Sequence, residues 1–228
     1  MDSMQFTRRL RGLVILVTLI AFVYMALPTV PGTIKSGEAA SNLGIIVPGK
    51  TGEKWYVCQG YNTSISHKGG DKYGLDLVSD SRAVGTSGCR AGYNNAQHRR
   101  VYTPVSGTIA WKYMPGGIVC IRINSTRSIK VAHMKTVRTA GYPAEWLDKP
   151  VGGAVTKGSS LGYVATPNEV ANGGISHIHI GVFANTNCGS SGSIPFSSGY
   201  GTQINGTRIW DLPSNGTANQ WRGTGLVR

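Results

Sequence analysis

The sequence predicts an all-β domain whose main feature is an antiparallel sheet with long loops. Glycine accounts for 32 of the 228 residues, 40% of the chain is hydrophobic and only 14% is charged. This composition is too apolar for a disordered protein and too rich in glycine for a helical bundle. Short β-prone runs alternate with turn signals such as Pro115-Gly116 and Asn124-Ser125, and this alternation indicates strands joined by hairpins and loops.

The expected strands are short apolar runs, each bounded by glycine, proline or polar residues. They cover residues 55–58, 74–78, 100–103, 107–111, 118–123, 129–134, 161–164 and 177–183. Residues 144–148 have the pattern of a short helical turn, and the chain shows no internal repeat.

Residues 1–41 have the layout of a signal for export. Three arginines between positions 8 and 11 precede an uncharged run at 12–27, and small residues at 37–41 offer a cleavage site. The run is shorter than the roughly 20 residues of a membrane span, so a cleaved signal peptide is favoured over an uncleaved signal-anchor. Both interpretations place the rest of the chain outside the cytoplasm, secreted or held at the membrane by its N-terminus.

The rest of the chain divides by composition into three parts. Residues 42–54 are predicted to form a linker or leading arm, residues 55–196 the folded domain, and residues 197–228 a loop-rich extension. The extension is dominated by Gly, Ser, Thr and Asn, and only residues 209–212 in it are a candidate for a final strand.

Four cysteines in an exported chain predict two disulfides. No two of them have the two-residue spacing of a zinc ribbon, so a cysteine metal site is not expected. Three pairings are open. We favour Cys58 with Cys89, which closes the loop around His67, and this leaves Cys120 with Cys188.

The chain is strongly basic, with a formal net charge of +13. Without residues 1–41 it keeps 19 basic and 8 acidic residues, a charge of +11. Such a surface attracts polyanions. For an exported protein we expect these to be anionic wall polymers and not nucleic acid.

A pair of histidines is the strongest local signal for chemistry. His177 and His179 occupy positions i and i+2 of a predicted strand, so both imidazoles project from the same face of the sheet. This arrangement can present a metal ligand beside a group that transfers protons, although structural histidines produce the same pattern.

Three further residues can join that pair. His67 precedes the apolar run 74–78, in which Asp76 needs a metal or a cationic side chain as its partner, because burying a bare carboxylate is very costly. In the predicted strand 129–134, His133 ends the row of side chains that Ile129 and Val131 begin on one face, and this face points to the interior or to a groove.

Together these residues resemble the lysostaphin-type (LytM-like) zinc endopeptidases, which hydrolyse peptidoglycan peptides. The resemblance covers residues 55–185 and includes the segments 101–110 and 151–162. It implies that residues 55–196 are a zinc metallopeptidase domain with a lysostaphin/LytM-like fold, monomeric, with peptidoglycan peptides as its substrate.

The resemblance also implies the roles of individual residues. One Zn²⁺ per chain would be held by His67, Asp76 and His179, and His177 and His133 would be catalytic. Three protein ligands leave a fourth position open, which is typical of a catalytic zinc site.

The chain departs from this family in one place. The usual first motif has three residues between its histidine and its aspartate, a spacing that His67 and Asp71 satisfy and that Asp76 does not. We favour Asp76, because an apolar strand holds a ligand more rigidly than a glycine-rich loop does.

Other functions stay open on the sequence alone. The main alternative is a catalytically inactive relative that binds the wall as a scaffold or activator. An exported basic domain with incidental histidines would bind no stoichiometric zinc, and a carboxypeptidase-like zinc enzyme would trim peptide ends.

Overall fold

The computed structural model describes residues 44–189, 192–196, 209 and 212–228. The predicted signal segment, 1–41, lies outside the described residues. Within the described part, no helix has the length and apolar character needed to cross a membrane.

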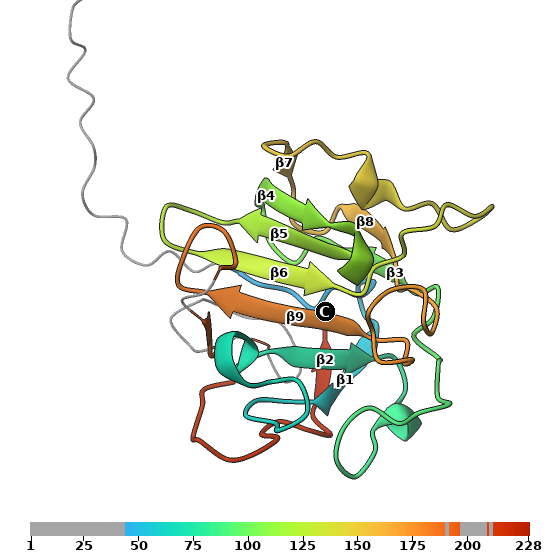
Figure 1. The fold of residues 1–228 in the computed structure, drawn as a ribbon, viewed down its shortest axis with the longest axis vertical. Coiled ribbons are helices and arrows are strands. Elements are labelled where there is room, and N and C mark those ends of the chain that lie inside the picture. The colour runs from blue at the N-terminus through green and yellow to red at the C-terminus, as the bar shows by residue number, and fades with distance from the viewer. Residues whose placement is uncertain (1–43, 190–191, 197–208, 210–211) are drawn as a thin grey trace, which may run out of the picture. The chain divides into compact units, whose positions relative to one another are not determined.

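The described residues build one large antiparallel sheet and one small one (Figure 1). The strand order of the large sheet is β11-β1-β2-β9-β6-β5-β4-β7, with β10 paired to β9. Its strands are β1 (Lys54–Gln59), β2 (Leu75–Val78), β4 (Gly107–Tyr113), β5 (Ile118–Arg122), β6 (Ser128–Ala132), β7 (Ala154–Val155), β9 (Ile178–Phe183), β10 (Ser193–Ile194) and β11 (Gly225–Val227). The small sheet pairs β3 (Arg100–Tyr102) with β8 (Ser160–Tyr163).

The predicted all-β, mainly antiparallel fold is therefore confirmed. A strand is found in each of the eight expected runs, and the helical elements among the described residues are single 3-10 turns. They are η1 (Gly69–Asp71), η2 (Ser81–Ala83), η3 (Met114–Gly116) and η4 (Glu145–Leu147). The last of these lies inside the expected helical turn, 144–148.

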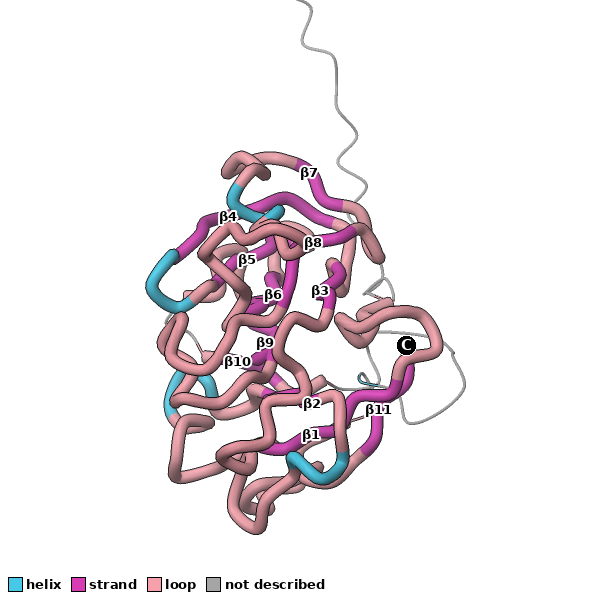
Figure 2. The backbone as a smooth tube through the Cα atoms, turned by 90° about the vertical axis from the view of Figure 1, so that its right-hand side faces the viewer, coloured by secondary structure: helices cyan, strands magenta, loops and turns pink. Residues whose placement is uncertain are grey.

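The main core lies between the large sheet and the small one, which occupies one side of the large sheet in Figure 2. The core forms because every second side chain of a strand points to the same face, so the apolar side chains of the large sheet gather on one side of it. Leu75 and Leu77 of β2 point into this core with Ile178 and Ile180 of β9, and they meet side chains of the small sheet such as Leu161. Asp76 and His179 consequently face the other side of the large sheet.

Two disulfides lie on the face of the large sheet that carries Asp76 and His179, and they have the pairing that the sequence favoured. Cys58–Cys89 ties β1 to the loop at 84–89, and Cys120–Cys188 ties β5 to the segment that follows β9. Cys120 and Cys188 pack with Phe183 in a small apolar cluster of their own. The loops around the open face are thus anchored covalently at two points.

Both ends of the described chain pack against the body. Ile45 and Val47 of the predicted leading arm are buried in the main core. Near the other end, β11 pairs with β1 through Lys54↔Val227, which the sequence analysis did not anticipate. Ile209 and Leu212 are buried, and Leu212 forms an isolated bridge with Phe196; residues 210 and 211 of that candidate strand lie outside the described part.

Candidate metal centre

Strand register brings the first two candidate ligands together. β2 pairs with β9 so that Asp76 lies directly opposite His179, and β6 pairs with β9 so that Ala132 is the other neighbour of His179. Directly opposed residues of an antiparallel pair have Cβ atoms about 5 Å apart. The carboxylate and the imidazole therefore meet on the open face, with β6 beside them.

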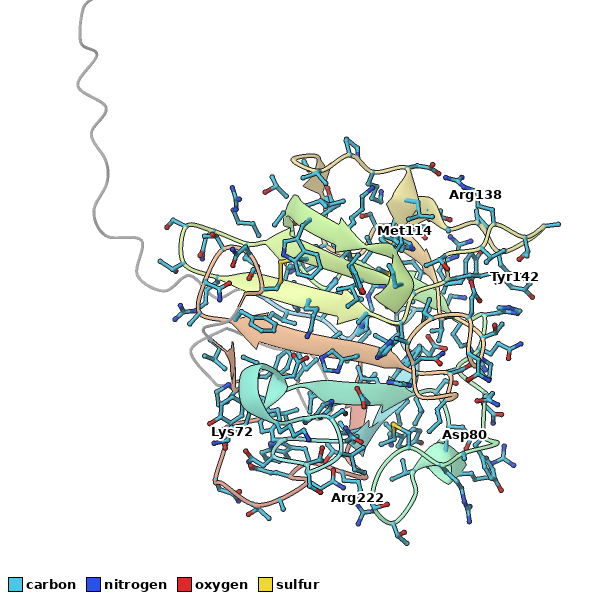
Figure 3. All side chains as sticks on the ribbon, in the orientation of Figure 1. Lys72, Asp80, Met114, Arg138, Tyr142 and Arg222 are labelled. Atoms are coloured by element: carbon cyan, nitrogen blue, oxygen red, sulfur yellow. A yellow bond between two sulfur atoms is a disulfide. The ribbon has the colours of Figure 1, made fainter. Side chains whose placement is uncertain are left out.

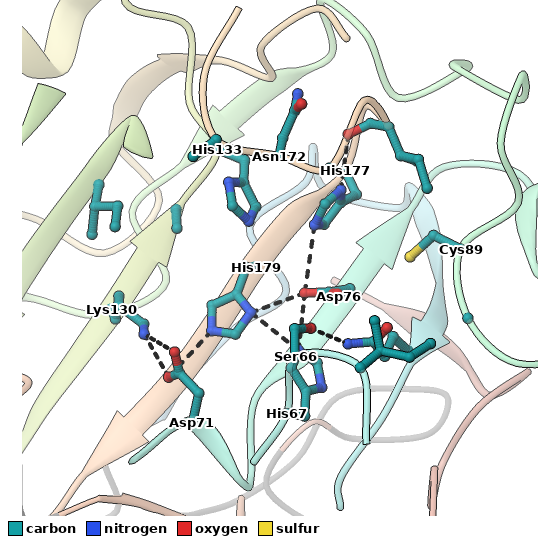
Figure 4. Close-up of a pocket in the computed structure, with 18 of the residues that line it drawn as sticks. Ser66, His67, Asp71, Asp76, Cys89, Lys130, His133, Asn172, His177 and His179 are labelled. Atoms are coloured by element: carbon teal, nitrogen blue, oxygen red, sulfur yellow. Dashed lines mark hydrogen bonds and ion pairs between the residues drawn. The ribbon is translucent and has the colours of Figure 1, made fainter. Parts of the chain in front are cut away.

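His67 joins them from the loop between β1 and β2. The residue is almost fully buried, its backbone N–H donates to Thr63 Oγ1, and its ring Nδ1–H donates to the Gly60 carbonyl oxygen at 2.6 Å. A neutral imidazole that donates through Nδ1 carries its lone pair on Nε2. That lone pair points at Asp76 and His179 (Figure 4).

The three facing atoms form a tight triangle. His67 Nε2 lies 3.2 Å from Asp76 Oδ1 and 3.2 Å from His179 Nδ1, and the last two atoms are 2.9 Å apart. Zinc bonds of about 2.0–2.2 Å at the tetrahedral angle place two ligand atoms roughly 3.3–3.6 Å apart. The triangle is slightly smaller than this, so a modest outward movement would seat the ion.

The charges of the group favour a cation. Burial raises the pKa of the Asp76 carboxyl, but His177 and His67 outweigh it and hold that pKa well below its usual range. Burial lowers the pKa of His179, but Asp71 and Asp76 raise it by more. A buried carboxylate and two imidazole nitrogens therefore converge on one point, and these are donor types that Zn²⁺ accepts.

Two more imidazoles line the same site. His177 donates through Nδ1 to the Ile175 carbonyl oxygen at 2.9 Å, and its Nε2 lies 3.6 Å from Asp76 Oδ1. The ring centres of His133 and His177 are 4.5 Å apart. His133 Nδ1 is buried without a hydrogen-bond partner among the described residues. Burial lowers the pKa of both histidines, so both are neutral at pH 7.

The predicted orientation of His133 is wrong in one respect. Ile129 and Val131 point into the main core, whereas His133 lines the open face with Ala132. The reason is local: β6 ends at Ala132, and His133 has a φ of 67°. This left-handed conformation is uncommon for a residue other than glycine, and it removes the side chain from the alternation of the strand.

Asp71 takes a different place from Asp76. It lies on the far side of the His179 ring, with its Oδ1 3.6 Å from His179 Nε2, and both its oxygens accept hydrogen bonds from Lys130 Nζ. The structure thus brings Asp76, and not Asp71, against His67 (Figure 4).

These side chains lie in a cleft of about 420 Å³. Besides the histidines and the two aspartates, its lining is mostly apolar or uncharged, and it includes Gln59, Ile65, Ser87, Asn172 and Ile175. The wall at 171–175 was not predicted, because its residues carry no signal beyond their position just before His177. Another part of the lining, at 87–89, is held by the Cys58–Cys89 disulfide, and that pairing was its available signal.

Comparisons with known proteins identify similar folds only among solved structures. No protein-family model and no curated protein matches the chain. The similar structures include the metalloprotease pseudoalterin from the deep sea, which is 18% identical with a TM-score of 0.48, over 81% of this chain and 98% of that one. They also include a zinc-containing peptidase from Vibrio cholerae, which is 14% identical with a TM-score of 0.42, over 71% of this chain and 40% of that one.

The antimicrobial peptidase lysostaphin from Staphylococcus simulans is also among them. It is 17% identical with a TM-score of 0.41, and the match covers 78% of this chain and 60% of lysostaphin. The family that the sequence resembles is thus represented among the similar structures.

Proposed function

We propose that this protein is an exported zinc-dependent endopeptidase that hydrolyses peptide bonds in bacterial cell-wall peptidoglycan. The observation that carries the proposal is the convergence of His67 Nε2, Asp76 Oδ1 and His179 Nδ1 within 3.2 Å of one another in an open cleft. Three protein donors with access from a cleft are typical of a catalytic site, because a structural zinc site has a closed set of four. The choice of peptidoglycan rests on the family resemblance of the sequence.

Three protein ligands would leave the fourth position of a tetrahedral site open to water or substrate. Zinc held by His67, Asp76 and His179 would supply a Lewis acid for the scissile carbonyl and would acidify the attacking water. The chain's own contribution is to hold the three donors in place on adjacent strands and to provide groups that move protons.

His177 is suited to accept the proton of that water. Its Nδ1–H is engaged by the Ile175 carbonyl, so the lone pair lies on Nε2, the atom that faces the ligand group. Because burial lowers its pKa, the ring is neutral and able to accept a proton at pH 7. The same nitrogen then delivers the proton to the leaving amine.

His133 is suited to stabilise the carbonyl oxygen as negative charge develops on it. Its ring lies beside His177, and its Nδ1 has no hydrogen-bond partner in the described part of the chain. A hydrogen-bond donor placed in this way is worth about 3 kcal/mol in a transition state.

Two further features support the location and the partner. The disulfides fit an oxidising compartment outside the cytoplasm. Exposed basic side chains such as Lys72, Arg138 and Arg222 lie at well-separated places on the surface (Figure 3), and this favours diffuse attraction to anionic wall polymers. The domain is proposed to act as a monomer.

The test combines a wall-clearing assay with a zinc measurement. The purified full-length protein should bind one zinc per chain and clear cell walls in a gel, and a chelator should abolish the clearing. His177→Ala should reduce clearing by about 10²- to 10⁴-fold while zinc stays bound. His98→Ala is the matched control, because His98 stacks on Tyr142 and does not line the cleft.

The possible outcomes separate the candidate functions. Clearing that survives chelation would contradict the zinc mechanism. One zinc per chain without any clearing would favour the wall-binding scaffold, and a chain that binds no zinc would favour the basic binding domain.

A further inference from the structure

The second ring nitrogen of His179 faces a carboxylate that the proposed mechanism does not use. His179 Nδ1 belongs to the ligand triangle, so the ring carries its proton on Nε2 when Nδ1 offers a lone pair. That Nε2 is buried and has no hydrogen-bond partner among the described residues. The nearby acidic oxygen is Asp71 Oδ1, 3.6 Å away, which a small rotation of either side chain brings to hydrogen-bond distance.

Asp71 is itself held by Lys130. Both carboxylate oxygens accept hydrogen bonds from Lys130 Nζ (Figure 4). Lys130 stands on β6 opposite Gly181 of β9, on the face that carries His179, and its side chain is largely buried over the Phe183 ring. Because the lysine side chain is largely buried and its ammonium group donates to both oxygens, it restrains the position of the carboxylate.

The loop between His67 and Asp76 positions Asp71 beside the His179 ring. After His67 the chain forms the 3-10 turn η1, which ends at Asp71, and the Gly74 N–H donates to the Asp71 carbonyl oxygen at 2.8 Å. Eight residues separate His67 from Asp76, compared with three in the usual motif of the family that the sequence resembles. The additional residues place a second carboxylate behind a metal ligand.

We propose that Asp71 and Lys130 form a positioning pair that sets the orientation and the tautomer of His179 for zinc. Asp71 receives the Nε2–H of His179, which leaves Nδ1 deprotonated toward the metal and makes the ring a stronger donor. Lys130 keeps the carboxylate behind the ring, so Asp71 does not compete with Asp76 as a ligand. This inference rests on the proposed zinc site, but its test requires no activity measurement.

The experiment measures zinc affinity of the full-length protein by competition with a chromophoric chelator. Asp71→Ala should weaken zinc binding by about 10- to 100-fold, the usual effect of losing a group that orients a ligand histidine. Asp71→Asn keeps an acceptor oxygen and should recover part of that loss, and Lys130→Met should weaken binding by a smaller factor than Asp71→Ala.

Glu145→Ala is the matched control. Like Asp71, Glu145 lies in a 3-10 turn and is paired with a basic side chain, Arg100, at 2.8 Å. The two acidic side chains are similarly exposed, at 33% for Asp71 and 29% for Glu145, but Glu145 does not line the cleft. Its loss should leave the zinc affinity unchanged.

A second measurement reports on the ring itself. In the zinc-loaded wild-type protein, the proton on His179 Nε2 should exchange slowly with solvent because Asp71 accepts it. In Asp71→Ala that proton should exchange measurably faster, whereas Glu145→Ala should leave the exchange unchanged. Equal zinc affinity in Asp71→Ala and Glu145→Ala, or an unchanged exchange rate of the His179 Nε2 proton in Asp71→Ala, would overturn the positioning role alone. Zinc binding without wall hydrolysis would contradict the proposed function alone, and a wild-type chain that binds no zinc would contradict both.

Discussion

Gly74→Ala should move a metal ligand without unfolding the protein. A Cβ atom at position 74 would lie 2.5 Å from His179 Cε1 and 3.1 Å from its Nε2. It would also lie 3.2 Å from the Asp71 carbonyl oxygen, so the backbone on that side leaves it little room. The backbone of Gly74 does not have a positive φ, so alanine is compatible with the backbone conformation and is opposed only by these contacts.

The size of the effect follows from the contact distance. Ordinary van der Waals contact begins at 3.4 Å, so the imidazole has to retreat from 2.5 Å by about 0.9 Å. A misplacement of about 1 Å at an active site can reduce the rate roughly 100-fold. We therefore expect Gly74→Ala to lower wall clearing by about two orders of magnitude and to weaken zinc binding in parallel.

Gly70→Ala is the control for the substitution itself. Gly70 belongs to the same loop, it has no positive φ, and a Cβ there meets no atom within 4 Å. It should keep full activity and gain about 0.4–1 kcal/mol of stability, because alanine restricts the unfolded chain. Zinc titration, thermal unfolding and wall clearing are measured on both variants. If Gly74→Ala matches Gly70→Ala in zinc affinity and clearing, the glycine does not set the position of the ring and the reasoning is refuted.

Three other predictions concern stability. Zinc at 100 times its dissociation constant should raise the free energy of unfolding by about 2.7 kcal/mol; in thermal unfolding, a gain that persists in Asp76→Ala would indicate that zinc binds elsewhere. Glu169 accepts hydrogen bonds from three backbone N–H groups and pairs with Lys135, and although burial raises its pKa, these donors hold that pKa below the usual 4.5. The stability that the ionised carboxylate contributes is therefore present above about pH 4.5 and disappears as the pH falls through the lowered pKa. In urea denaturation, Glu169→Gln should lower the free energy of unfolding by about 2 kcal/mol at pH 7 and by much less below that pKa. An equal loss at both pH values would contradict the ionised network. Replacing Cys120 and Cys188 by serine should cost about 4 kcal/mol, because the disulfide spans a sequence separation of 68 residues, and a far smaller loss would show that the unfolded chain is already compact there.

The strands could be predicted because their signals are local. An apolar run such as that of β9 identifies a buried strand from its own residues, and the polar breaks around it locate its ends. β11 could not be predicted in this way. It has only three residues, Gly225–Val227, and it is a strand because β1 offers its edge to it, which is a contact across most of the chain length.

For the candidate site, too, the local features could be predicted and the long-range contacts could not. Residue types and the i, i+2 spacing of His177 and His179 follow from the sequence, because alternation along a strand is a local property. The position of His133 does not, since its left-handed φ just beyond the end of β6 takes its side chain out of the alternation of the strand. The place of Asp71 behind His179 likewise depends on the path of a whole loop and on Lys130 of another strand.

The sequence by itself determined an all-β fold, its strand-forming runs and a small set of side chains able to hold a metal. The tertiary structure decided which of those side chains meet: Asp76 opposite His179 through the register of β2 on β9, and His67 against both through its loop. The physical reason is that each residue's face along a strand is set by its immediate neighbours. The residues that lie opposite it are set by the register that buries the whole core best.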